Sequence, residues 1–398
     1  MRPLHAVLVE NPTPRFTQRL ATALDGTGPA LLPLDAALPV ARLEELISAF
    51  QPDAIEDSEG VVTARSASDR ALADDTAVII GTSGSTGAPK GVELSAAALL
   101  ASARASLARV GAAPGERWLC CLPVTHVAGL QVLVRALASG TEPVLAARAD
   151  ASTVASSGCA HVSLVPTQLR RLLAEGGAGP LAGFTSVLLG SAAAPAALLA
   201  RARDAGIGVV TTYGMTETCG GCVYDGFPLD GVQVEVRSDE RIWIRGPVLF
   251  SGYVGAARRP ADGWFRTGDL GRLAGSGLLT VRGRADDVIN TGGHKVVPGE
   301  VAAAVASHPG VRDVAVVGQP DAEWGERVVA VVVPADSSDP PGLDLLRMHV
   351  RGLLPRYAFP SRVVMVDAVP MLPSGKHDIV RLRQELLRRE QTEAESVT

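Results

Sequence analysis

Short apolar runs alternate with longer Ala- and Leu-rich stretches from residue 76 onward. The run at 76–84 (TAVIIGTSG) predicts a strand that ends in a Gly-rich turn, and 94–112 predicts the helix that follows it. The same alternation predicts further strands and helices within 117–124, 129–140, 161–175, 186–206 and 209–214. Strands that alternate with helices are typical of a mostly parallel sheet with helices on its faces. This part of the chain is therefore predicted to have an α/β fold.

The pattern changes after Thr218, where short strands with turn residues between them replace the strand–helix units. The segments 232–238, 241–247 and 278–284 predict a small β-barrel-like subdomain. A third pattern follows Arg284, where two helices and three strands are predicted in about 110 residues, an ordinary size for one α+β domain.

These patterns predict two domains. The large N-terminal domain spans 1–284 and includes the β subdomain at 217–284. The smaller α+β C-terminal domain spans 285–398. Its polar tail, from Arg388, is expected to be frayed.

Composition limits the class of protein. Hydrophobic residues make up 47% of the 398 residues and charged residues 20%, with a net charge of −5. These values are typical of a globular protein with a substantial core, and no basic segment suggests binding to nucleic acid. The N-terminus does not have the pattern of a signal peptide, and no apolar run approaches the roughly 18 residues that a membrane span needs. We expect a cytoplasmic protein without a membrane anchor; the sequence is compatible with a homodimer but does not determine the oligomeric state.

The five cysteines do not have the spacing of a disulfide framework. Cys219 and Cys222 form a CxxC pair, which is one half of a zinc or redox motif. Neither a second CxxC nor a suitably spaced histidine pair accompanies it. Small buried thiols are the expected alternative.

Lysine is rare in this chain. Only Lys90, Lys295 and Lys376 occur among its 37 basic residues, and each lies in a Gly-rich stretch. Lysine is a compact point charge on a flexible stem, whereas the guanidinium of arginine is a planar fork. A compact cation among glycines suits a site that reaches a phosphate or carboxylate oxygen through a narrow gap.

The Gly-rich stretch at 81–91 (GTSGSTGAPKG) directly follows a predicted strand. Its backbone N–H groups and hydroxyls can form an anion-binding nest. It is not a Walker A loop, because the spacing of glycine and lysine differs and Pro89 precedes Lys90. A flexible linker is the alternative, and the preceding apolar strand argues against it.

This loop resembles the phosphate loop of the acyl-adenylate-forming superfamily, which includes acyl-CoA synthetases, adenylation domains and luciferases. Other segments match that superfamily's motifs in the required order: LPVTHVAG (122–129), GSAAAP (190–195), TTYGMTETCGG (211–221), GWFRTGDLG (263–271), GRADDVINTGGHKVVPGEVAAAV (283–305) and LPSGKHD (372–378). The resemblance extends over roughly residues 76–380. It implies ATP-dependent activation of a carboxylic acid, with ATP, Mg²⁺ and coenzyme A (CoA) as cofactors or co-substrates.

The resemblance implies a role for each motif residue in joining a carboxylate to the α-phosphorus of ATP. Two anions must meet in this reaction, so charge compensation and alignment are the main catalytic tasks. Thr216 would contact the α-phosphate, and Glu217 would help to hold Mg²⁺. The implied ligands of the β- and γ-phosphates are Thr82, Ser83, Gly84, Ser85, Thr86, Gly87 and Lys90, with Thr86 also counted as catalytic.

The resemblance also implies partners for the nucleoside. Tyr213 and Gly214 would flank the adenine together with the backbone near Ser191 and Ala192. The ribose hydroxyls would donate hydrogen bonds to Asp269, and Arg284 would support the same sugar. Outside these motifs, a carboxylate such as that of Asp269 or Glu217 would be interpreted as part of the solvated surface.

Lys376 resembles the adenylation lysine of the superfamily, which bridges the acyl carboxylate and the α-phosphate. The implied hinge of the C-terminal domain is Asp286, and rotation about it would replace Lys376 by the loop at Gly292 and Gly293. Small residues there would let the pantetheine arm of CoA pass close to the backbone. Lys295, beside His294, would contact CoA or the nucleotide, or it would form a structural ion pair.

Two features of the sequence bear on which carboxylic acid is the substrate. The chain is short before its phosphate loop, and Arg135 lies nine residues after His126 in an apolar helix. Arg135 is either a snorkelling side chain at a helix edge or the counter-ion of a second substrate carboxylate. Together with the segment 211–232, these features most resemble the ligases that join o-succinylbenzoate to CoA in menaquinone biosynthesis. His126 would then line the acyl pocket, whose shape stays open because Thr125 replaces an aromatic residue of many relatives.

Three alternatives stay open at this point. Another aryl- or acyl-CoA ligase would use the same chemistry. A stand-alone adenylation enzyme that loads a carrier protein would need a docking surface. A non-catalytic nucleotide-binding relative is disfavoured by the intact Lys90, Glu217, Asp269, Arg284 and Lys376, since a binding module does not need the adenylation lysine.

Overall fold

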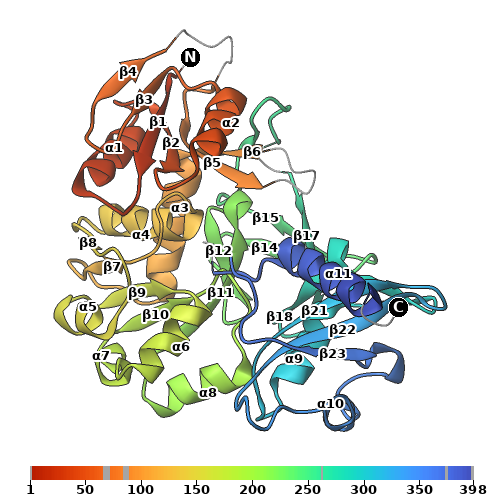
Figure 1. Ribbon diagram of the computed structural model, residues 1–398. Helices are drawn as coiled ribbons and strands as arrows, with labels where there is room; N and C mark the ends of the chain where they lie inside the picture. Colours follow the sequence, from red (N-terminus) through yellow and green to blue (C-terminus); the bar gives the residue numbers. More distant parts are fainter. Residues whose placement is uncertain (1, 66–71, 84–88, 261–262, 373–374, 396–398) are drawn as a thin grey trace. The chain divides into compact units, whose positions relative to one another are not determined.

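The computed structural model describes residues 2–65, 72–83, 89–260, 263–372 and 375–395 (Figure 1). The chain divides into two compact units. Unit 1 comprises Met1–Ala194, Leu198–Val234 and Ile244–Phe265, and unit 2 comprises Pro195–Ala197, Glu235–Trp243 and Arg266–Thr398.

The first sheet of unit 1 has seven strands in the order β16-β6-β5-β2-β1-β3-β4. The strands are β1 (Leu4–Val9), β2 (Ala30–Asp35), β3 (Ala54–Glu56), β4 (Val62–Ala64), β5 (Thr76–Ser83), β6 (Pro89–Ser95) and β16 (Gly252–Tyr253), with helices α1 (Pro14–Asp25) and α2 (Val40–Phe50) between them. Strand β1 pairs in parallel with β2 and β3, and β2 pairs in parallel with β5. Strands β5 and β6 form an antiparallel hairpin. The strands before residue 66 extend the sheet beyond the elements that we predicted.

The second sheet of unit 1 has the order β13-β12-β11-β10-β9-β7-β8. Its strands are β7 (Trp118–Cys120), β8 (Val144–Leu145), β9 (His161–Leu164), β10 (Ser186–Leu189), β11 (Val209–Met215), β12 (Gly220–Tyr224) and β13 (Phe227–Pro228). Pairing is parallel from β8 to β11, and only β12 and β13 run antiparallel. The predicted mostly parallel sheet is therefore confirmed.

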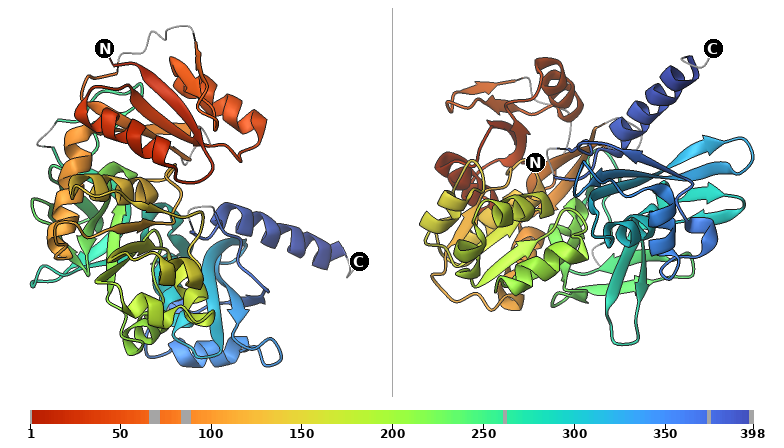
Figure 2. Two further views of the ribbon diagram at one scale, coloured as in Figure 1. Left: turned by 90° about the vertical axis from the view of Figure 1, so that its left-hand side faces the viewer. Right: turned by 60° about the horizontal axis from the view of Figure 1, so that its bottom comes forward.

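Helices cover this second sheet as the strand–helix pattern requires (Figures 1 and 2). Helices α3 (Ala96–Arg109) and α4 (Val127–Ala138) pack together, and α4 contacts β7, β9 and β12. A separate apolar cluster joins the strands to helices α5 (Ala151–Ser156), α6 (Pro166–Ala174), α7 (Ala178–Ala182) and α8 (Ala196–Asp204). Burial of apolar side chains on both sides explains the nearly continuous hydrophobic runs of these strands.

Two further sheets lie mainly in unit 2. The strands predicted after residue 217 pair in a four-stranded sheet of β14 (Gln233–Val236), β15 (Arg241–Arg245), β17 (Phe265–Leu273) and β18 (Leu279–Arg284). The five-stranded sheet comprises β19 (Ile289–Thr291), β20 (His294–Val296), β21 (Val311–Asp321), β22 (Gly325–Pro334) and β23 (Arg362–Met365), with helices α9 (Pro298–Ala306), α10 (Leu343–Val350) and α11 (Ile379–Glu395). The α+β pattern predicted for the C-terminal region is confirmed.

Two sequence-based expectations meet a different arrangement in unit 2. The tail was expected to fray from Arg388, but α11 continues to Glu395, and Leu382 and Leu386 anchor the helix in the core. The predicted domain boundary at residue 284 does not coincide with the division into units, because β17 and β18 are hydrogen-bonded neighbours in which Asp269 pairs with Arg284. The functional boundary and the hinge at Asp286 stay predictions. Among the described residues, no helix is long and apolar enough to cross a membrane.

Gly214 permits the close approach of β11 to β12. A β-carbon at this position would lie 2.0 Å from the carbonyl oxygen of Gly220. Gly214→Ala should therefore push the strands apart and lower the free energy of unfolding by about 1–3 kcal/mol, as overpacking of a core does. Urea unfolding followed by circular dichroism measures this change.

Gly179 in α7 provides the control, because an added β-carbon there would meet nothing within 4 Å. Gly179→Ala should leave the protein equally stable or make it slightly more stable. Equal stability of the Gly214→Ala variant and the wild type would show that β11 and β12 can separate without cost.

Candidate active site

The carboxyl ends of β10 and β11 bring two predicted adenine-binding segments together. The strands pair in parallel with Leu189 opposite Thr211, so the residues that follow each strand lie side by side. Ser191 adopts a left-handed conformation with φ 68°, which turns the chain sharply after β10. A β-carbon on Gly190 would lie 2.2 Å from the hydroxyl of Thr212, which shows how closely the two segments approach. Ser191 and Ala192 thus follow a strand that lies beside the strand of Tyr213 and Gly214. Their contact with adenine stays a prediction.

Glu217 lies one residue after Thr216 in a 3₁₀ turn (Thr216–Thr218) that follows β11. The phenolic O–H of Tyr253 donates a hydrogen bond to Oε1 of Glu217 across 2.9 Å. Tyr253 itself belongs to β16 and pairs with Val92 of β6. Glu217 is thus attached to the sheet that carries the β5–β6 hairpin. Tyr253 was missed in the sequence, where no local signal links it to Glu217.

The β5–β6 hairpin carries the phosphate-loop residues. Thr82 lies opposite Lys90, and its hydroxyl donates to the backbone carbonyl of Lys90 across 3.2 Å. Lys90 is exposed, and no described residue pairs with its ammonium group. Only the backbone of Ser83 is described, and the predicted ligands Gly84, Ser85, Thr86 and Gly87 lie outside the described residues.

The donor set near Glu217 fits Mg²⁺ that is held mainly by phosphates. Among the described residues, no group of three or more His, Cys, Asp or Glu side chains could hold a metal by itself. Mg²⁺ in nucleotide sites commonly uses one or two carboxylates together with phosphate oxygens and water. Tyr253 occupies only Oε1 of Glu217, so Oε2 can serve as that single protein ligand.

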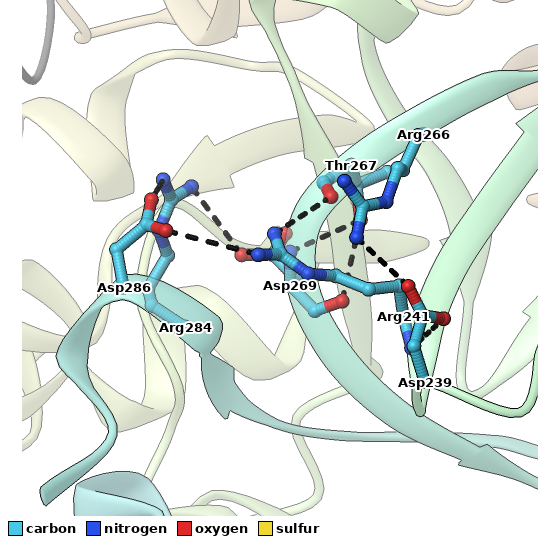
Figure 3. Close-up of polar contacts among 7 residues, drawn as sticks. All are labelled: Asp239, Arg241, Arg266, Thr267, Asp269, Arg284 and Asp286. Carbon is cyan, nitrogen blue, oxygen red and sulfur yellow. Dashed lines mark hydrogen bonds and ion pairs between the residues drawn. The ribbon is translucent and has the colours of Figure 1, made fainter.

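The predicted ribose residues face each other on β17 and β18 (Figure 3). Asp269 is buried and accepts a hydrogen bond from Nη1 of Arg284 at 3.4 Å, while Nη2 of Arg284 lies 3.4 Å from Asp286. A β-carbon on Gly268 would lie 2.7 Å from this guanidinium. The glycine of the Thr-Gly-Asp motif therefore leaves room for Arg284 to cross the strand.

Neighbouring charges extend this group. Arg241 lies 3.8 Å from Asp286, and Arg266 donates to Asp239 across 2.8 Å (Figure 3). The Thr267 hydroxyl donates to the carbonyl of Ile242 and accepts from the backbone N–H of Asp269. The backbone that presents the Asp269 carboxylate is thus fixed at both its threonine and its aspartate.

Lys376 lies in a tight turn whose ends are fixed. Met371 and His377 form an antiparallel bridge, and the N–H of Leu372 donates to the Lys376 carbonyl across 2.8 Å. His377 lies 3.2 Å from Oδ2 of Asp313 on β21. The Lys376 side chain is exposed, and no described residue pairs with it. The lysine therefore projects from an anchored turn with its charge available.

The predicted CoA loop is the two-residue turn between β19 and β20. Gly292 and Gly293 have φ 53° and 79°, the positive angles that a type I′ hairpin turn requires. A β-carbon on Gly292 would lie 2.7 Å from the indole of Trp324. His294 stacks on Tyr357 with ring centroids 4.2 Å apart, and Lys295 is exposed without a described partner.

Trp324 and Tyr357 were not predicted as site residues. Trp324 is 53% exposed although it is large and apolar. Its position depends on the β21–β22 turn, whose carbonyl at Trp324 accepts a hydrogen bond from the Gly292 N–H at 2.9 Å. No signal in the sequence links Trp324 to the Gly292–Gly293 loop, because the two segments are distant in the sequence and meet only in the fold.

Arg135 is buried in α4, so the snorkelling interpretation is wrong. Only 5% of the residue is exposed, because all sides of this helix segment are packed. Nη2 of Arg135 donates to the Ser163 hydroxyl across 2.8 Å, and the guanidinium lies 4.4 Å from the ring centroid of Trp118. No described carboxylate pairs with it. His126, at the N-terminus of the same helix, is half-buried.

A buried histidine adjoins the Trp118 ring. His161 stacks on Trp118 with centroids 4.6 Å apart. Its Nδ1 lies 2.8 Å from the Ser186 hydroxyl and its Nε2 lies 2.9 Å from Oε2 of Glu116. Burial lowers the pKa of His161 below its ordinary value of 6.5, and the hydrogen bond to Glu116 opposes this shift.

Two family models match most of the chain. The model described as AMP-binding enzyme matches residues 17–254, and the model described as AMP-binding enzyme C-terminal domain matches residues 300–376. The chain belongs to the AMP-binding enzyme family.

Relatives within the AMP-binding enzyme family include a probable 2-succinylbenzoate–CoA ligase of Mycobacterium tuberculosis. It is 45% identical over 341 residues, which cover 81% of this chain and 86% of that protein. A 2-succinylbenzoate–CoA ligase of Listeria monocytogenes is 31% identical over 329 residues, covering 78% of this chain and 70% of the relative.

Solved structures of similar proteins share the fold. The o-succinylbenzoate CoA synthetase of Bacillus subtilis, in complex with its acyl-adenylate intermediate, has a TM-score of 0.80 and 27% identity, covering 96% of this chain and 88% of that one. ATP-bound MatB from Rhodopseudomonas palustris has a TM-score of 0.85 and 26% identity, covering 97% and 89%. The fold predicted from the motifs is confirmed.

The CxxC cysteines of this family member are buried thiols. Cys219 and Cys222 are both fully buried and free. Burial raises the pKa of Cys222 to about 12 and that of Cys219 still further. Thiols with raised pKa values are poor nucleophiles and poor metal ligands at neutral pH.

The lowered pKa of His161 predicts a loss of stability in mild acid. The unfolded chain binds a proton at His161 near pH 6.5, whereas the folded protein does so only at lower pH. Between these values the unfolded state binds more protons, so the free energy of unfolding falls as the pH falls. The stability that neutral His161 contributes is fully present above pH 6.5.

Urea unfolding at about pH 7.5 and about pH 5.5 tests this prediction through the difference between the two pH values. In the His161→Gln variant that difference should be smaller than in the wild type. The other six histidines are common to both proteins, so their effects cancel. An unchanged difference would mean that the pKa of His161 is not lowered.

Proposed function

We propose that this chain is an AMP-forming acid–CoA ligase that joins o-succinylbenzoate to CoA in menaquinone biosynthesis. The similarity to 2-succinylbenzoate–CoA ligases over most of the chain supports the reaction. The observation that carries the choice of substrate is Arg135, a buried guanidinium without a described carboxylate partner. A buried charge of this kind requires an anion, and the second carboxylate of o-succinylbenzoate supplies one.

In the first half-reaction, an oxygen of the aliphatic carboxylate attacks the α-phosphorus of ATP. The bond between the α- and β-phosphates breaks and pyrophosphate leaves. Lys90 and Thr82 hold the outer phosphates, and Thr216 contacts the α-phosphate. When bound through Glu217, Mg²⁺ offsets the charge of the phosphates. Preorganised charges of this kind lower the barrier because they need not be rearranged during the reaction.

Asp269 and Arg284 hold the ribose during this step. The Asp269 carboxylate is nearly buried and its backbone is fixed by Thr267. A carboxylate in such a position can accept hydrogen bonds from two ribose hydroxyls without moving. Arg284 lies 3.4 Å from the Asp269 carboxylate and partly compensates its negative charge when no nucleotide is bound.

Lys376 supplies the positive charge between the reacting carboxylate and the α-phosphate. Its anchored turn presents an ammonium group that no described residue neutralises. A freely available point charge suits two converging anions better than a planar guanidinium does.

In the second half-reaction, the sulfur of CoA attacks the acyl carbonyl carbon. The C–S bond forms, the C–O bond to AMP breaks, and the thiol proton is lost. The Gly292–Gly293 turn would line the path of the pantetheine arm, with Lys295 near the CoA phosphates. The stacked pair of His294 and Tyr357 and the exposed Trp324 offer flat surfaces for the CoA adenine.

Rotation of the C-terminal domain about Asp286 would replace Lys376, which serves the first half-reaction, by the Gly292–Gly293 turn, which serves the second. Asp286 is 59% exposed, and its ion pairs with Arg284 and Arg241 span 3.4 and 3.8 Å. Exposed pairs of this kind contribute little, on the order of 0–1 kcal/mol. Breaking them during a rotation would therefore cost little.

We place the reaction in the cytoplasm. All five cysteines are free, which fits a reducing compartment.

The substrate proposal predicts a selective effect of Arg135. With ATP and CoA, the wild type should convert o-succinylbenzoate far better than 3-benzoylpropionate, which lacks the ring carboxylate. Arg135→Met should raise the KM for o-succinylbenzoate by roughly 10- to 100-fold, the loss expected for a buried hydrogen bond between charged groups. The KM for 3-benzoylpropionate should change much less.

Pyrophosphate release and thioester mass measure both acids in the same assay. Arg104→Met, an exposed arginine on the neighbouring helix α3, is the matched control and should behave as the wild type. Equal changes for both acids in Arg135→Met would remove Arg135 from the substrate site. If another carboxylic acid in a test panel were converted with a higher kcat/KM than o-succinylbenzoate, that acid would replace o-succinylbenzoate as the proposed substrate.

The two lysines of unit 2 should separate the half-reactions. Lys376→Ala should slow adenylation on the order of 10²- to 10³-fold, as removal of one preorganised donor does. It should leave thioester formation from supplied acyl-adenylate largely intact. Lys295→Ala should show the reverse, with a raised KM for CoA and normal pyrophosphate release. If Lys376→Ala slowed both half-reactions equally, the proposal that rotation about Asp286 replaces Lys376 by the Gly292–Gly293 turn would be wrong.

A further inference from the structure

Arg135 belongs to a buried stack of three side chains. Its guanidinium lies 4.4 Å from the centroid of Trp118, and the Trp118 ring stacks on His161 at 4.6 Å with 25° between the planes. Trp118 and His161 are 0% exposed. Trp118 also pairs with His161 in the register of β7 and β9, so the stack is built across two neighbouring strands.

The stack is anchored at its histidine end. Nδ1 of His161 lies 2.8 Å from the hydroxyl of Ser186, the first residue of β10. Nε2 lies 2.9 Å from Glu116, which precedes β7. The imidazole therefore cannot turn without breaking a hydrogen bond on either side. A fixed imidazole in turn fixes the plane of the indole against which it packs.

Trp118 itself has no hydrogen bond that would hold it. Among the described residues, Nε1 of Trp118 is buried without a partner. A buried tryptophan N–H usually has a partner, because leaving it unpaired costs free energy. The faces of this ring pack on Arg135 and His161, so these two groups help to determine its position.

Arg135 depends on this ring in the absence of substrate. Ser163 is its one described hydrogen-bond partner, and Nε has none. Burial lowers the pKa of Arg135, opposed by the nearby Tyr224 and Cys120, which reflects the cost of a desolvated charge. The negative face of an indole offsets part of that cost and fixes where the guanidinium lies.

We propose that Trp118, held in place by His161 and Glu116, positions Arg135 for the second carboxylate and so sets the preference for a dicarboxylic acid. Trp118 and His161 do not touch the substrate in this proposal; they are positioning residues. The inference rests on the proposed role of Arg135 and extends it to residues that the superfamily motifs do not include.

Substitution of Trp118 in the full-length enzyme tests the proposal. Trp118→Leu removes the aromatic face and should raise the KM for o-succinylbenzoate on the order of tenfold, the effect expected from a buried cation–π contact. The KM for 3-benzoylpropionate and the kcat for either acid should change little. Trp118→Phe keeps an aromatic face and should restore most of the affinity.

A matched control removes another indole under a guanidinium. Arg237 lies 3.8 Å from the ring of Trp243 on β15, and Trp243 belongs to unit 2. Trp243→Leu should leave the ratio of the two KM values unchanged. Melting temperature and ATP binding show whether each variant folds. Trp118→Met, which also lacks an aromatic face and should raise the KM for o-succinylbenzoate in the same way, carries the test if Trp118→Leu does not fold.

A double variant that combines Trp118→Leu with Arg135→Met tests whether Trp118 changes the KM ratio through Arg135. If Trp118 acts through Arg135, Trp118→Leu should not alter the KM ratio further in the Arg135→Met background. A rise in KM for both acids would show a merely structural role and overturn the inference. If Arg135→Met changes the ratio and neither Trp118 variant does, the inference fails and the proposed function stands. If Arg135→Met leaves the ratio unchanged, the role of Arg135 and the inference fall together.

Discussion

Parallel pairing of β10 with β11 is the constraint on which the proposed nucleotide site depends. Both strands end at the same edge of the sheet, so the segments that follow them must share one small space. That space admits little more than backbone, because a β-carbon on Gly190 would clash with the Thr212 hydroxyl. A β-carbon on Gly214 would likewise clash with the Gly220 carbonyl of the next strand, β12. The motif glycines are therefore required by the approach of neighbouring strands. The close approach in turn places Thr216 and Glu217 where the sheet ends.

Positive charge is distributed unequally between the two basic residue types. Several arginines are held in ion pairs, including Arg282 with Glu300 and Arg258 with Asp75. By contrast, Lys90, Lys295 and Lys376 are all exposed, and no described residue pairs with them. A cation that is already neutralised offers less to a phosphate or carboxylate. The unpaired lysines are suited to ligands that arrive with negative charge, and the paired arginines hold the scaffold.

The proposed binding site for the acid presents its positive charge differently. Arg135 is buried and is kept in place by a ring and a hydroxyl, without a described carboxylate. A permanent carboxylate partner would stabilise the folded protein but would compete with the substrate for the same guanidinium. An aromatic face offsets part of the desolvation cost and leaves the charge available. The stack of Arg135, Trp118 and His161 thus balances stability of the empty protein against affinity for an anion.

The sequence by itself determined the α/β pattern, the family and the residues of each motif. Those features depend on local order: apolar runs define strands, and glycines next to a lysine define an anion-binding turn. Only the tertiary structure decided that Tyr253 holds Glu217, that Trp324 packs on Gly292, and that Arg135 is buried against Trp118. These partners are distant in the sequence, and their contact depends on strand register and on the packing of helices against sheets. The short strands before residue 66 were missed for the same reason, since neighbouring strands stabilise them more than their own sequence does.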